Sequence, residues 1–175
     1  MRESLMITWK NSIFVFTVCI LFSLSSDGRR AIVLSQVLTS ELNQLLSDSG
    51  ELHLSFFNQN EESISQALSK TLKQINRAKE SSVVIEEHSR SHLNKILDAA
   101  KGRLELTQTT EGDARRRNLK SAFEQLAHLA RIYKVDRRFR IFFCPKDRSS
   151  WVQVGWKAKN PINPETLANC GKAVK

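Results

Sequence analysis

The sequence NEESISQALSKTLKQINRA, residues 60–78, carries the clearest structural signal in the chain. Its apolar residues recur every three or four positions, at Ile64, Ala67, Leu68, Leu72, Ile75 and Ala78. An α-helix has about 3.6 residues per turn, so this spacing places them on one helical face. Asn60, followed by Glu61 and Glu62, is typical of a helix start, because Asn caps a free backbone amide and acids favour the first turn. We expect an amphipathic helix after Asn60.

Three further segments show the same periodicity, one before this helix and two after it. The first covers about residues 30–57, and Gly50 within it predicts a kink or break. The third helix is expected to start at a cap formed by Ser81 or Ser82. The fourth is expected to follow a capping box at residues 110–113, where Thr and Asp are three positions apart. No helix of this kind can bury its apolar face alone, so the sequence predicts an antiparallel four-helix bundle.

The pattern changes at the end of the bundle, which we place at residues 27–135. Residues 139–143 alternate, and residues 151–156 are rich in Val and Trp, so both runs are predicted to be short strands around a turn. The rest of the tail is rich in Pro and Asn and shows neither period. We therefore expect a mainly α fold in which residues 136–175 form a β-hairpin and an irregular tail, packed on the bundle. The two tryptophans of the hairpin are expected to be core anchors.

The N-terminal residues 1–26 have the pattern of a secretory signal peptide. Arg2 and Lys10 precede an apolar and hydroxyl-rich run over residues 12–24, and small residues follow. This run is shorter than the roughly 20 residues that a transmembrane helix needs. We expect cleavage, with lipidation at Cys19 as an alternative, no transmembrane anchor after cleavage, and a periplasmic or secreted protein. Both methionines lie in this leader.

The remaining cysteines, Cys144 and Cys170, lie in the tail. An even pair in an exported chain favours a disulfide. A bridge around a loop of about 27 residues would stabilise the fold by roughly 3 kcal/mol. A soft-metal site and free thiols are the alternatives. The bridge is predicted to clip the strands and the tail against the bundle.

A spaced motif in the tail consists of Cys144, Pro145, Trp151, Asn160, Pro161, Cys170 and Gly171. Together with the helices before it, the motif resembles an exported bacterial domain-of-unknown-function family. That family occurs free-standing in the periplasm and fused to RND-type heavy-metal efflux adaptors. The resemblance implies a helical bundle in the envelope and a role accessory to copper or silver efflux. The methionines usual in the family are replaced here by Lys146 and Leu167, so the thioether ligands are absent.

Candidate metal ligands besides the two cysteines are His88 and His92, which are four residues apart on the third helix. This spacing puts two imidazoles on one face, although solvated surface histidines give the same pattern. Cu and Zn are the ions that such residues would hold, and no other cofactor is expected. His53 is expected to pack at a boundary. No nucleophile stands beside a base, so the sequence does not predict an enzyme.

The positive charge is concentrated in the C-terminal part of the chain. Residues 112–175 contain 15 Lys and Arg against 5 Asp and Glu, whereas residues 27–111 contain 10 against 12. In an exported protein this favours an envelope protein or an anionic surface component as partner, not nucleic acid. The residues expected to line one basic surface are Arg115, Arg116, Arg131, Lys134, Arg137, Arg138 and Arg140. We expect a non-catalytic binding or scaffold module, with a polyanion or membrane-surface module as the alternative.

Overall fold

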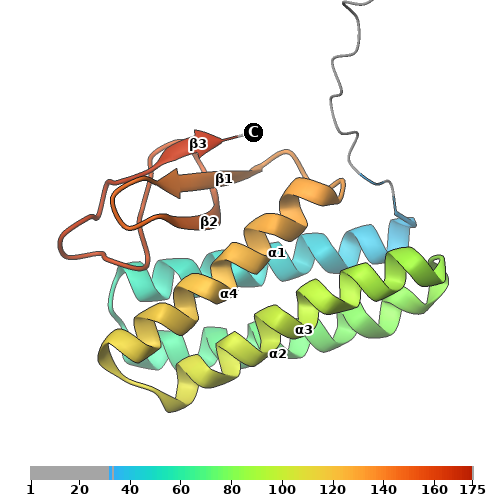
Figure 1. Cartoon of the computed structure of the whole chain (residues 1–175), viewed down its shortest axis with the longest axis horizontal. Coiled ribbons are helices and arrows are strands. Elements are labelled where there is room, and N and C mark those ends of the chain that lie inside the picture. Colours follow the sequence, from blue (N-terminus) through green and yellow to red (C-terminus); the bar gives the residue numbers. More distant parts are fainter. Residues whose placement is uncertain (1–31, 33, 175) are drawn as a thin grey trace, which may run out of the picture. The chain divides into compact units, whose positions relative to one another are not determined.

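The structure is a computed structural model that describes residues 32 and 34–174. The predicted signal peptide lies outside these residues. Four α-helices are followed by three short strands (Figure 1). The helices are α1 (Gln36–Phe57), α2 (Glu61–Ser81), α3 (Glu87–Thr109) and α4 (Gly112–Ile132). The strands are β1 (Phe139–Cys144), β2 (Ser149–Val154) and β3 (Lys172–Val174). The predicted mainly α fold, with a small sheet and a disulfide, is confirmed.

Successive helices run in opposite directions, with α1 beside α2 and α3 beside α4 (Figure 1). Their apolar faces meet in one core, in which Leu42, Leu68, Leu97 and Phe123 are almost completely buried. Removing such side chains from water is the main favourable contribution to folding, at about 25 cal/mol per Å² of apolar surface. Within the described residues, no helix combines the length and apolarity needed to cross a membrane.

The predicted helix starts are correct at α2 and wrong at α3. The Asn60 side chain accepts a hydrogen bond from the amide of Ser63 at 2.9 Å, as expected of a cap. The predicted cap at Ser81 or Ser82 is wrong because a short 3₁₀ turn intervenes and α3 begins only at Glu87. The Ser82 hydroxyl instead donates to a carbonyl in the last turn of α2. A hydroxyl at a helix end serves either terminus, and sequence spacing does not distinguish the two.

The predicted capping box before α4 is also wrong. Thr110 donates its hydroxyl hydrogen back to the carbonyl of Leu106, so it closes α3 and does not open α4. The residue at the start of α4 is Glu111, whose side chain makes no capping hydrogen bond. The loop between the two helices is therefore too short to give Thr110 the capping position.

Gly50 does not interrupt the first helix, and the predicted kink or break there is wrong. α1 continues from Gln36 to Phe57. Glycine costs a helix interior about 1 kcal/mol relative to alanine, which is less than the burial of one large apolar side chain. Leu46, one turn before Gly50, and Leu52, two residues after it, are both fully buried. Tertiary packing of α1 therefore outweighs the poor helix propensity of Gly50.

The strands form one antiparallel sheet in the order β2-β1-β3. β1 and β2 pair from Phe139 with Val154 to Cys144 with Ser149, as the predicted hairpin requires. The third strand is not predicted, because residues 172–174 are too few to show a period; it pairs with the free edge of β1. β2 is the strand nearest the bundle and packs on α4 and α1 (Figure 1).

Candidate functional site

The predicted disulfide is present between Cys144, at the end of β1, and Cys170, two residues before β3. The sulfur atoms are 2.03 Å apart and the Cα atoms 5.2 Å apart. The bridge therefore joins the central strand to the returning tail. Because each sulfur is bonded to the other, the pair presents no thiolate to a metal ion.

Trp151 of β2 is the centre of the packing between the sheet and the bundle. It is fully buried, as predicted, and its ring stacks on His53 of α1 and on Phe142 of β1. A Cβ atom on Gly171 would lie 2.7 Å from Cη2 of Trp151, closer than real side chains approach. Trp151 and Gly171 of the tail motif therefore have a packing role.

His53 is also part of this interior and is not a surface ligand. It is 1% exposed, and its Nε2 lies 2.6 Å from the carbonyl oxygen of Lys159. Burial lowers the pKa of His53 to about 4, although the hydrogen bond to the carbonyl acts in the opposite direction. The imidazole is therefore neutral at pH 7 and donates its Nε2 hydrogen to Lys159.

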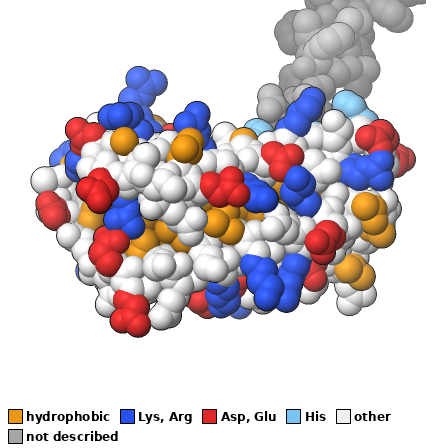
Figure 2. Space-filling view, turned by 90° about the horizontal axis from the view of Figure 1, so that it is seen from below, with side chains coloured by type: hydrophobic (Ala, Val, Ile, Leu, Met, Phe, Trp, Pro, Cys, Tyr) orange, Lys and Arg blue, Asp and Glu red, His pale blue; other side chains and the backbone are white. Residues whose placement is uncertain are grey.

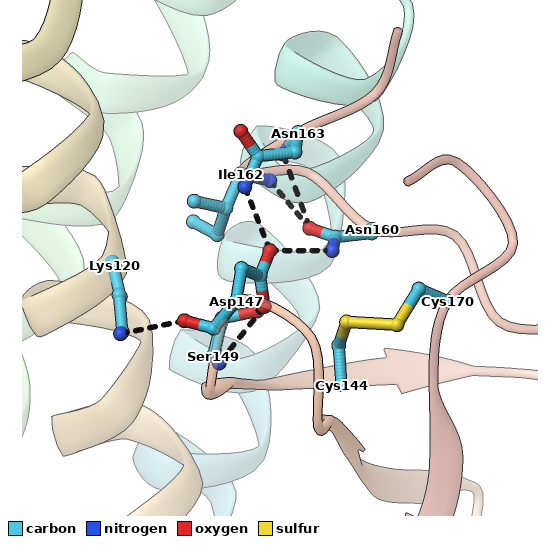
Figure 3. The surroundings of a disulfide bond; sticks show 8 residues. All are labelled: Lys120, Cys144, Asp147, Ser149, Asn160, Ile162, Asn163 and Cys170. Atoms are coloured by element: carbon cyan, nitrogen blue, oxygen red, sulfur yellow. Dashed lines mark hydrogen bonds between the residues drawn. A yellow bond between two sulfur atoms is a disulfide. The ribbon is translucent and has the colours of Figure 1, made fainter. Parts of the chain in front are cut away.

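Asp147, in the turn between β1 and β2, holds the tail in place (Figure 3). Its carboxylate accepts hydrogen bonds from the side-chain amides of Asn160 and Asn163, at 2.8 and 2.7 Å. It also accepts from the amide and hydroxyl of Ser149, and its backbone carbonyl accepts from Lys120 of α4. Burial alone would raise the pKa of Asp147, but the hydrogen bonds outweigh it and lower the pKa. No local sequence pattern predicts this role of Asp147.

The two motif prolines flank the same network. Pro145 begins the turn that contains Asp147 and is exposed, whereas Pro161 is buried directly after Asn160. The Asn160 side chain also accepts hydrogen bonds from the amides of Ile162 and Asn163. The motif residues are therefore explained by the shape of the tail, without a ligand.

The predicted pair of histidines lies on the surface of α3. His88 and His92 are both exposed on α3. His92 lies 3.2 Å from the hydroxyl of Tyr133, and its ring centre is 6.2 Å from that of His128 on α4. Among residues 32 and 34–174, no three His, Cys, Asp or Glu side chains are grouped to hold a metal ion. The proximity of His128 to His92 was not predicted, because the spacing of residues within one helix does not show which helices pair.

The predicted basic residues do not share one surface. Arg115, at the start of α4, donates two hydrogen bonds to Glu61, and Arg116 pairs with Asp113. Arg131 lies at the other end of α4, about 24 Å away at 1.5 Å per residue. Arg131 is followed by Lys134, Arg137, Arg138 and Arg140 on the way to β1 and within it. The prediction of a single surface is wrong because the length of α4 separates the two groups.

The candidate site combines Arg138 and Arg140 of this second group with residues of α1 and residues from the end of β2 onward. Trp156 is 76% exposed, so the prediction that it is a core anchor is wrong. It follows Gly155, whose φ of 96° turns the chain away from the sheet. The guanidinium carbon of Arg140 lies 3.1 Å from the centre of the Trp156 ring. We define the Trp156 surface as Leu54, Val154, Trp156, Arg138, Arg140, Lys157 and Lys159.

A groove of about 440 Å³ runs through the Trp156 surface, between α1 and the end of β2. Leu54 and Val154, both substantially exposed, give it apolar walls, and Arg138, Lys157 and Lys159 supply its positive charge. Among the described residues that line it, Glu51 is the only acid, and it accepts hydrogen bonds from Lys70 at 2.8 and 2.9 Å. Arg138 is paired with Asp136 at 3.5 Å, whereas no acid among the described residues forms an ion pair with Lys157 or Lys159. The groove therefore combines apolar walls with the positive charge of these two lysines.

The opposite side of the bundle has a different character. Figure 2 shows the side formed by α2 and α3, where basic, acidic and apolar side chains are interspersed. On this side Lys79 of α2 pairs with Asp98 of α3. Interspersed charges give little net field at a distance, whereas like charges around an apolar groove reinforce one another. The Trp156 surface is therefore the better candidate for recognition.

No family model, no curated protein and no solved structure matches this chain. The resemblance of the tail motif to the exported family therefore stays a prediction, and the role of the Trp156 surface is argued from its geometry alone.

Proposed function

We propose that this protein is an exported, non-catalytic binding module that holds an anionic component of the bacterial envelope on its Trp156 surface. The observation that carries the proposal is an indole left 76% exposed among four cations, next to a groove whose one acid is already paired. A solvated basic face needs no exposed tryptophan. An exposed tryptophan inside a cluster of cations is typical of a recognition surface.

Two physical effects support binding at this surface. Covering Trp156, Leu54 and Val154 would remove apolar area from water. The guanidinium and ammonium groups would form charge-assisted hydrogen bonds with carboxylates or phosphates, and their field would speed the encounter. The disulfide fits the oxidising compartment that the proposal requires.

A role accessory to heavy-metal efflux would have to use protein contacts. The two cysteines are bonded to each other, and the histidines bring no third ligand of the usual kinds in the described part of the chain. Soft ions such as Cu(I) bind thiolates and thioethers. We therefore place such a role in the recognition of a partner on the Trp156 surface.

The test compares three anionic probes with the purified protein: vesicles of phosphatidylglycerol, lipopolysaccharide, and polyglutamate. Vesicles of phosphatidylcholine serve as the neutral control. We expect at least one anionic probe to bind, with affinity falling at least tenfold between low and high salt. The double variant R138E/K157E should lose at least tenfold at low salt.

The matched control is K73E/R77E, which makes the same charge change at exposed positions of α2. It should retain most of the binding. If none of the three probes binds, or if both double variants weaken binding equally, the proposed function is wrong.

A further inference from the structure

The groove in the Trp156 surface has a shape that a general anion site does not need. We infer that its occupant is an acidic peptide segment of a partner protein, which inserts an apolar side chain between α1 and β2. This inference rests on the proposed function and names the partner class. The volume of about 440 Å³ lies within the range of about 300–1,000 Å³ that is usual for ligand sites.

The floor of the groove depends on Gly50. α1 is helical through this position, so no turn requires a glycine there, and alanine would be the better helix former. A Cβ atom built on Gly50 meets no atom within 4 Å. Neither backbone conformation nor close packing therefore explains the missing side chain. Its effect is to leave the groove open beside Leu54.

The walls fit an apolar side chain and the surroundings fit carboxylates. Leu54 is 41% exposed and Val154 is 58% exposed, and both line the groove. Arg138 and Lys157 are exposed around it, where acidic residues flanking an inserted side chain would meet them. Arg138 has a partner in Asp136, but Glu51 is held by Lys70 and does not compensate the charge of Lys157.

A flat bilayer would use this surface differently. A membrane interface contacts protruding groups such as Trp156 and the cations around it, and the floor at Gly50 would not affect it. A peptide that buries a side chain between two elements contacts the floor directly. Filling the groove therefore separates a peptide from a lipid or polysaccharide surface.

The experiment selects peptides from a random display library on the full protein, and then measures their dissociation constants by fluorescence anisotropy. We expect the enriched peptides to carry two or more Asp or Glu around one Leu, Ile, Phe or Trp. Gly50→Leu should lower their affinity at least tenfold while leaving the binding of phosphatidylglycerol vesicles and polyglutamate unchanged. R138E/K157E should weaken every acidic ligand, and K73E/R77E none.

A second variant tests the groove without depending on the folding of Gly50→Leu. Leu54→Glu puts an acid on an exposed groove wall without filling the core. Charge repulsion should then lower the affinity for the selected peptides at least tenfold. Circular dichroism checks that both variants retain their helices. No enrichment, enriched peptides without acids, or equal affinity for wild type and both groove variants would overturn the inference. If vesicles or polyglutamate still bind through Arg138 and Lys157 in that case, the proposed function stands without it.

Discussion

His53 is an ionisable side chain that the fold keeps uncharged. Burial lowers its pKa to about 4, and its Nε2 hydrogen is used by the carbonyl of Lys159. In the unfolded chain an imidazole takes up its proton near pH 6.5. Between these two values the unfolded state binds more protons than the folded state, so stability falls as the pH falls.

The first prediction is a loss of stability between about pH 6.5 and pH 4. The free energy of unfolding should decrease there by up to about 3 kcal/mol, as the cited pKa values imply. Urea titrations at closely spaced pH values measure it. His53→Gln should be less stable at pH 7 but should show a flatter profile, whereas His88→Gln, at an exposed position, should keep the wild-type slope. An unchanged slope in His53→Gln would refute the role of this residue.

At the scale of elements, a glycine in the tail and a glycine in a helix differ in the space available for a side chain. Gly171 lies against Trp151 of β2 and has no room for a side chain. Gly102, inside α3, has open space where a Cβ atom would be placed. The same substitution should therefore change the free energy of unfolding in opposite directions at the two positions.

The second prediction is that Gly171→Ala destabilises the protein by roughly 2 kcal/mol, because overpacking shifts a buried ring. Gly102→Ala should stabilise it by about 0.5–1 kcal/mol through helix propensity. Thermal and urea denaturation measure both values. Near-ultraviolet circular dichroism, which reports on Trp151, should change only in Gly171→Ala. Stabilisation by Gly171→Ala would contradict the close contact.

At the scale of the whole molecule, the disulfide joins the sheet to the irregular tail that covers it. The third prediction is that reduction, or the double change Cys144→Ala and Cys170→Ala, lowers the free energy of unfolding by roughly 3 kcal/mol. The tail should loosen before the bundle, because the bridge joins β1 to the tail and no helix carries either cysteine. The expected signature is loss of the near-ultraviolet signal with the far-ultraviolet helix signal retained. Simultaneous loss of both signals would show that the bundle depends on the clip.

The parts of the fold that sequence predicts are those encoded locally. The stripe from Ile64 to Ala78 defines α2, and the even number of cysteines left after the predicted signal peptide indicates the bridge. The parts that were missed depend on residues distant in sequence. β3 exists because β1 offers an edge, and the hydrogen bonds of Asp147 come from residues 149–163 and from α4.

The candidate site was less predictable than the fold. The sequence predicts the excess of basic residues in the C-terminal part. These residues lie at the two ends of α4, and of the predicted set only Arg138 and Arg140 belong to the Trp156 surface. Trp156 was expected inside because a Val- and Trp-rich run resembles a strand throughout. The strand ends before the turn at Gly155, so Trp156 lies outside the sheet. The alternation of residues in the run does not predict this turn.

The strand order has a consequence for how the protein is made. β1 is the central strand, yet one of its neighbours, β3, is the last element of the chain and lies just beyond the second cysteine. As the chain is synthesised its helices can pair early, because their contacts are between neighbours in sequence. The sheet and the bridge must wait until the tail has emerged. Until then the unpaired edge of β1 is the segment most exposed to wrong pairing, and the bridge forms only after the tail has returned to β1.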